Sequence, residues 1–157
     1  MNLGSSRRWF LPLAVILVLL SVGGEISPVG ASPSIATVQN VSGTAAVVRQ
    51  GQTISASVGL EIRENDTLCT GPDGSIGMVF NDDTSLSLGP ESVLIIDKFV
   101  FAPRQGKFSM VLRMIKGTAA YLSGLICKLA PGSLLFETPT ASIGIRGTKF
   151  VVKVEGK

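Results

Sequence analysis

The stretch SIGMVFNDDTSLSL, residues 75–88, decides the fold class of this chain. Apolar side chains stand at every second position on both sides of Asn81-Asp82-Asp83. Alternation with a period of two is typical of half-buried β-strands. The Asn-Asp-Asp segment tolerates turn and left-handed backbone conformations. The stretch therefore predicts two strands joined by a tight turn.

The rest of residues 32–157 repeats this plan of short apolar runs separated by turn residues. Clear breakers are GPDG, which ends at Gly74, and PRQG at 103–106. The turns recur about every 7 to 12 residues, as expected of an all-β sandwich, barrel or solenoid. The run at 125–129 is read as one more strand, and Lys116-Gly117 as a break between two strands.

The last run, KFVVKV at 149–154, alternates apolar residues with lysines. It predicts a final strand with lysine on its outer face, a device that protects an exposed sheet edge. We therefore predict an all-β domain of many short strands. The arrangement is either a sandwich or β-solenoid-like, because no internal period distinguishes the two.

Composition excludes several classes of protein. Apolar residues make up 45% of the chain and charged residues 16%, which is unlike a disordered chain. Histidine is absent, so no histidine-based triad or metal site exists. The net charge is +3 and the sequence has no run of basic residues, which argues against nucleic-acid binding. The carboxylates lie scattered at turns, so we expect no enzyme activity, no cofactor and no metal.

Residues 1–31 are typical of an export signal. A basic start, MNLGSSRR, precedes an apolar run of about 16 residues, whereas a membrane-spanning helix needs roughly 20. Val29-Gly30-Ala31 suits signal peptidase, so we predict cleavage after Ala31. Residues 32–157 are then periplasmic or secreted, without a stable membrane span. The route stays open, because SRRWFL resembles a twin-arginine signature and the apolar core suits general secretion.

Cys69 and Cys127 are the two cysteines of the chain, 58 residues apart. In an oxidising compartment such a pair can form a disulfide, which stabilises by about 4 kcal/mol on the chain-entropy model. The alternative is two small buried apolar side chains. The sequence leaves both readings open.

Three stretches of the chain, taken in order, resemble the FecR-type extracytoplasmic domain family. They are GLEIRENDTLCTG at 59–71, DDTSLSLGPES at 82–92 and ETPTASIGIRGT at 137–148. Asp83 stands where the family usually has glycine, and aspartate tolerates that turn conformation. The resemblance implies an exported all-β domain used for contacts. Only eight residues precede the apolar run, so the family's cytoplasmic sigma-factor-binding part is not carried over.

Arg146, Asp66 and Asp82 are the candidate binding residues. Arg146 precedes Gly147, which we place at a corner with positive φ. Its guanidinium either fastens the fold, by bonding carbonyls or a carboxylate such as Asp66 or Asp82, or anchors an anionic or carbohydrate ligand. Asp66 holds its own turn rather than acting as an acid, and Asp82 lies in the turn between the two predicted strands.

The sequence thus predicts an exported, non-enzymatic binding or scaffold domain that contacts an envelope protein or polysaccharide. One alternative is an envelope structural subunit that assembles through its β edges, against which the edge lysines argue. The other is a sensor component tethered to the membrane by an uncleaved N-terminal segment.

Overall fold

The computed structural model describes residues 32–146 and 149–156. The strands are β1 (Ser34–Ser42), β2 (Ala45–Arg49), β3 (Gln52–Ser55), β4 (Glu61–Arg63), β5 (Thr67–Thr70), β6 (Ser75–Phe80), β7 (Ser85–Leu88), β8 (Val93–Ala102), β9 (Lys107–Leu122), β10 (Leu134–Glu137), β11 (Ser142–Gly144) and β12 (Lys149–Val154). A short 3-10 turn, η1 (Pro103–Gln105), and one helix, α1 (Leu125–Leu129), complete the described chain.

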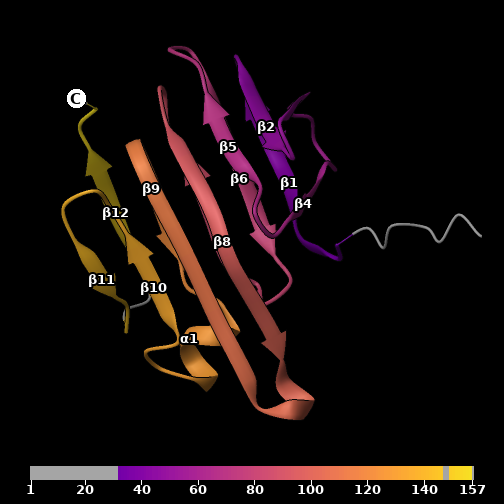
Figure 1. Cartoon of the computed structure of the whole chain (residues 1–157), viewed down its shortest axis with the longest axis vertical. Helices are drawn as coiled ribbons and strands as arrows, with labels where there is room; N and C mark the ends of the chain where they lie inside the picture. The colour runs from indigo at the N-terminus through magenta and orange to yellow at the C-terminus, as the bar shows by residue number, and fades with distance from the viewer. Residues whose placement is uncertain (1–31, 147–148, 157) are drawn as a thin grey trace, which may run out of the picture. The chain divides into compact units, whose positions relative to one another are not determined.

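The strands form one curled sheet, so the all-β prediction is confirmed (Figure 1). The order along the main path is β3-β2-β5-β8-β9-β7-β6-β1-β4, with β10, β11 and β12 attached off it through β9. Nearly all pairings are antiparallel, and the exception is β10, which runs parallel to the first half of β9. The predicted hairpin at 75–88 is confirmed as β6 and β7.

The curled sheet has two limbs, one that contains β8 and β10 and one that contains β7 and β12, and strand β9 belongs to both. Its first half pairs with β8 and β10, and its second half pairs with β7 and β12. The chain turns from one limb to the other at Gly117, which has a φ of +97°. A strand that switches sheets does so through such a bend. The break predicted at Lys116-Gly117 is therefore a corner within one strand rather than a gap between two.

The hydrophobic core lies between the two limbs. Phe80 of β6 stacks on Phe99 of β8 with ring centroids 5.4 Å apart, which joins one limb to the other. Phe150 of β12 lies 4.8 Å from the ring of Tyr121, its partner on the neighbouring strand, and 5.5 Å from that of Phe136 in the other limb. Such aromatic pairs stabilise by about 0.5–1.5 kcal/mol beyond their buried area. The apolar positions of the alternating strands thus meet in one interior.

The run at 125–129 is a helix and not the strand that its sequence suggests. The backbone N–H of Leu125 donates to the Asp82 carbonyl at 2.7 Å, and the N–H of Ile126 donates to the Asp82 carboxylate at 3.2 Å. These contacts hold the first turn of α1 against the β6–β7 turn. A partner 44 residues away in the chain decides this conformation, which a local pattern cannot indicate.

The two cysteines are free thiols in the structure, so the disulfide alternative is not realised. Leu68 and Thr70 face the interior, so Cys69 between them points to the outer face of β5. Cys127 is buried in α1, where its sulfur lies 3.7 Å from the Tyr121 hydroxyl. The reading as a buried side chain holds for Cys127, whereas Cys69 is only partly buried.

We expect a maleimide to label one thiol in the native domain and two after denaturation without reductant. Labelling of Cys69 should be slow at neutral pH, because burial raises the pKa of its thiol and the Lys116 ammonium only partly offsets this. Mass spectrometry of the labelled protein counts the adducts. Failure of the denatured, unreduced protein to take up any label would show that a disulfide exists.

Candidate functional site

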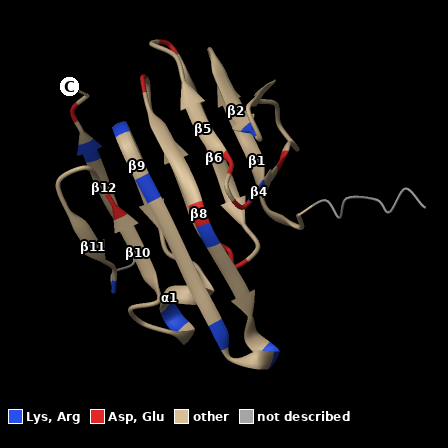
Figure 2. Ribbon diagram, viewed as in Figure 1, with Lys and Arg blue, Asp and Glu red and all other residues tan. Residues whose placement is uncertain are grey.

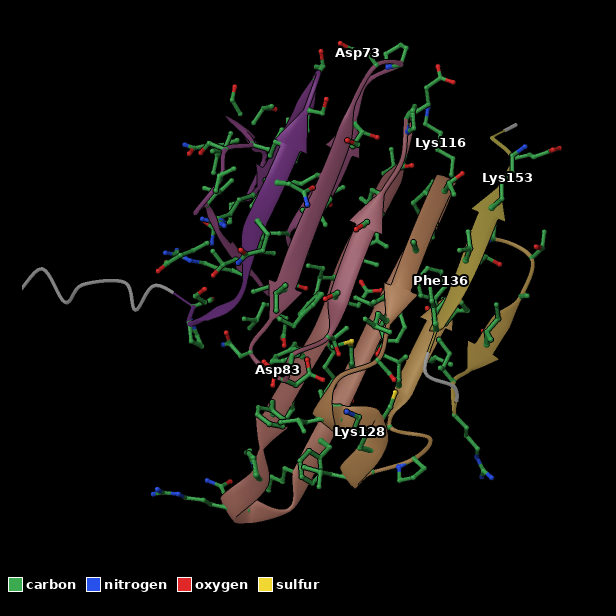
Figure 3. All side chains as sticks on the ribbon, turned by 180° about the vertical axis from the view of Figure 1, so that it is seen from behind. Asp73, Asp83, Lys116, Lys128, Phe136 and Lys153 are labelled. Atoms are coloured by element: carbon green, nitrogen blue, oxygen red, sulfur yellow. The ribbon has the colours of Figure 1, made fainter. Side chains whose placement is uncertain are left out.

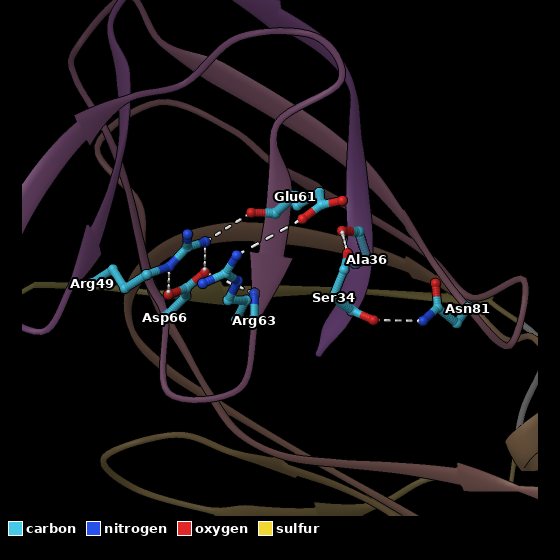
Figure 4. A network of polar contacts seen from close by, with 7 residues as sticks. All are labelled: Ser34, Ala36, Arg49, Glu61, Arg63, Asp66 and Asn81. Atoms are coloured by element: carbon cyan, nitrogen blue, oxygen red, sulfur yellow. Dashed lines mark hydrogen bonds and ion pairs between the residues drawn. The ribbon is translucent and has the colours of Figure 1, made fainter. Parts of the chain in front are cut away.

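Asp66 is buried at the turn between β4 and β5, and its carboxylate accepts three hydrogen bonds (Figure 4). The guanidinium of Arg49 donates to its two carboxylate oxygens at 2.8 and 2.7 Å. The backbone N–H of Arg63 donates to it at 2.8 Å. The hydrogen bond to Asp66 also raises the pKa of Arg49. Arg49 reaches the Glu61 carbonyl as well, so the network ties β2 to β4.

Asp82 is fully buried at the turn between β6 and β7. Its carboxylate accepts hydrogen bonds from the Thr84 hydroxyl at 2.8 Å and from the Thr84 backbone N–H at 3.2 Å. It also accepts the Ile126 N–H of α1. Next to it, Asp83 is exposed and has a φ of +64°, the left-handed conformation that this turn requires. Asp82 therefore links the β6–β7 turn to the first turn of α1 through hydrogen bonds.

The structure does not bring Arg146 together with Asp66 or Asp82. The expectation that Arg146 pairs with one of these carboxylates is wrong, because Arg49, Thr84 and backbone N–H groups occupy them. Arg146 itself is exposed after β11. Gly147, predicted at a positive-φ corner, lies outside the described residues.

Gly74 lies in the turn before β6, close to the main chain of the connection between β1 and β2. A Cβ on Gly74 would meet the carbonyl group of Thr44. Its backbone is not left-handed, so here glycine provides space rather than an unusual φ.

Replacing Arg146 by alanine should leave the fold almost unchanged. The side chain is exposed and forms no ion pair with the residues that the structure describes, so we expect a change in unfolding free energy within about 0.5 kcal/mol. Urea denaturation followed by circular dichroism measures it. A loss of several kcal/mol would instead make Arg146 a fastener of the fold.

A groove with a volume of about 720 Å³ opens where the β9 corner, the β10–β11 hairpin and the end of β12 meet. This volume lies in the range of ligand sites in proteins. Apolar side chains of Ile115, Ile143 and Val152 line it, together with Pro139. Ile115 and Ile143 are 39% and 38% exposed, so the groove offers them as accessible apolar surface. The family-like stretch TPT at 138–140 forms part of its wall.

Two lysines border this groove, Lys116 at the β9 corner and Lys153 on β12. Figure 3 labels both at the same end of the molecule, and Figure 2 shows basic residues at these ends of β9 and β12. Neither lysine forms an ion pair within the described ranges. A second, more polar recess of about 450 Å³, which includes Glu91, adjoins the groove and shares both lysines and Glu155. The arrangement offers apolar surface beside two unpaired cations.

Chemically, the groove is suited to noncovalent contact. Sequence reasoning placed Lys153 on an outer face but missed Lys116, because only the corner at Gly117 brings these lysines to one rim. It also missed Arg49, because nothing in the sequence around the Gln50-Gly51 turn indicates that Arg49 pairs with Asp66. The lining residues 138–140 and Ile143 belong to the third stretch that resembles the family, which was noted as a resemblance and not as part of a groove.

The comparisons with known proteins give one match. The family model described as FecR protein matches residues 66–157, more than half of the chain. It covers the second and third of the three recognised stretches in full and the first from Asp66 onward. No curated protein and no solved structure matches the chain. None of the helices in the described part of the chain has the length and apolar content needed to cross a bilayer.

Proposed function

The chain belongs to the FecR protein family, whose domains are of the extracytoplasmic type, and from this we propose that it is an exported, non-enzymatic binding domain of the cell envelope. In this proposal residues 1–31 direct export and are removed, and residues 32–157 hold an envelope partner by noncovalent contact. The partner is a protein or a polysaccharide. The family membership also supports a regulatory or sensory context for the contact.

The observation that carries the proposal is the groove at the β9 corner. In this groove two partly exposed isoleucines lie together with Pro139 and Val152, and a contiguous apolar surface of this kind suits contact with a partner. The two lysines at its rim have no ion-pair partner within the described residues, so they are available to an anionic group. Arg146, exposed after the neighbouring β11, is a further candidate contact.

Site-specific photo-crosslinking in cells tests this function. A photoreactive phenylalanine analogue at Ile143 lies in the groove, and the same analogue at Val58, which is 67% exposed and does not line the groove, is the matched control. We expect a discrete, larger adduct from position 143 in the envelope fraction and none from position 58. Protease treatment of the adduct then distinguishes a protein partner from a polysaccharide.

Two outcomes would contradict the proposal. The first is that no adduct forms at either position. The second is full-length protein, still containing residues 1–31, recovered from the cytosol.

A further inference from the structure

Strand β12 is an open edge next to the groove. Within the described residues it pairs with β9 alone, through six consecutive positions from Lys149 to Val154. Its other side therefore presents backbone N–H and C=O groups without a strand partner. Such an edge is a template for a further strand, because main-chain hydrogen bonds supply affinity for any extended peptide.

The two faces of β12 differ in chemistry. On the outer face Lys149 and Lys153 flank Val151, whose side chain is 63% exposed. On the inner face Phe150 packs against Tyr121 and Phe136, and Val152 and Val154 continue the row into the groove. Side chains of paired strands share a face at each register position. A strand added to β12 thus meets cations on one face and an apolar groove on the other.

We propose that an extended peptide segment of a partner protein, with acidic and apolar residues at alternate positions, adds as a strand to the free edge of β12. Its acidic side chains lie opposite Lys149 and Lys153, and its apolar side chains enter the groove between β12 and Ile143. This inference rests on the proposed binding function and specifies the partner class as a protein segment. A polysaccharide has no backbone N–H ladder to match that of the edge.

The same lysines argue against a second copy of this chain as the occupant. In an antiparallel pair of β12 strands, lysine would lie opposite lysine or the exposed Val151, and like charges directly opposite one another are destabilising. The edge is thus protected against self-pairing and remains open to a strand of opposite charge. Charge repulsion thus disfavours a second β12 strand, while the backbone edge itself stays accessible.

Binding of short capped peptides to the domain of residues 32–157 tests the proposal, with fluorescence anisotropy as the readout. The probe alternates valine and glutamate, and its counterpart alternates valine and lysine. We expect the glutamate peptide to bind at least about tenfold more tightly. The double variant Lys149→Glu, Lys153→Glu should reverse that preference.

The matched control is the double variant Lys107→Glu, Lys128→Glu. It makes the same change in net charge at exposed sites, and Figure 3 shows Lys128 at the opposite end of the molecule from Lys153. We expect this control to keep the preference of the wild-type domain for the glutamate peptide. Reversal in the control as well would show that net charge, and not the β12 edge, attracts the peptide.

Backbone methylation of the probe tests strand addition itself. N-methyl groups at alternate residues block one edge of the peptide, so methylation in one register should abolish binding and methylation in the other should be tolerated. Equal binding of both methylated peptides, or of glutamate and lysine probes, would overturn the proposal. So would a dimer in sedimentation that dissociates in the variant Val151→Lys, because a second copy would then occupy the edge.

The two proposals fail in distinguishable ways. If position 143 crosslinks in the envelope but no peptide probe binds, strand addition is wrong and the binding function stands with another class of partner. If the crosslinks are absent as well, the binding function is wrong.

Discussion

Gly117→Ala is expected to lower the free energy of unfolding by about 3–5 kcal/mol, from a left-handed backbone together with overpacking. Gly117 has a φ of +97° at the corner of β9, a conformation that disfavours any side chain. An added Cβ would also collide with Ser92, including its main-chain Cα. Ser92 cannot move aside, because its hydroxyl accepts the Thr118 N–H at 3.0 Å and donates to the Thr118 carbonyl at 3.2 Å. Urea denaturation measures the loss.

Gly106→Ala is the matched control for this experiment. Gly106 also has a positive φ, +64°, but an added Cβ meets nothing within 4 Å. We therefore expect only the conformational cost of about 1–2 kcal/mol there. The difference between the two variants measures the close approach of Ser92 to the corner. Equal losses at both positions would contradict the role of the corner described here.

Asp82→Ala is expected to cost about 3–4 kcal/mol of stability, because it leaves several buried donors without an acceptor. The groups affected are the backbone N–H and hydroxyl of Thr84 and the N–H of Ile126. The variant should also lose the anchoring of α1, visible as faster amide exchange at Leu125 and Ile126. Hydrogen exchange by mass spectrometry and urea denaturation check both effects.

Asp83→Asn serves as the control in the same turn. Asp83 is exposed, and asparagine tolerates its left-handed backbone, so stability should change by less than about 0.5 kcal/mol. Asp82→Asn should lie between the two, because the amide retains one acceptor oxygen and turns an NH₂ group toward a donor. A tolerated Asp82→Ala would show that the buried carboxylate does not hold the turn to α1.

Local patterns in the sequence predicted the strands well where alternation is strict. The β6–β7 hairpin and the final strand β12 follow directly from the period-two positions of their apolar residues. The run at 125–129 was misassigned because its helical conformation depends on Asp82, far away in the chain. The corner at Gly117 was read as a break, since a glycine after lysine does not reveal that the strand continues in another limb.

The candidate site was less predictable than the fold. Asp66 and Asp82 were identified as turn residues, but their partners Arg49 and Ile126 come from elements that only the tertiary structure brings near. The groove combines side chains from β9, β11 and β12, and its lysines carry no motif. Residues at one rim cannot be grouped from sequence when they come from three strands in a curled sheet.

Because β9 belongs to both limbs, we expect neither limb to unfold independently of the other. Damage to its pairing with β8 is transmitted along the same backbone to β7 and β12. The molecule should therefore melt as one cooperative unit, with a calorimetric enthalpy equal to its van't Hoff enthalpy. A partner bound to β12 as proposed would contact the strand next to β9, and binding to the folded state alone would raise the stability of the whole cooperative unit.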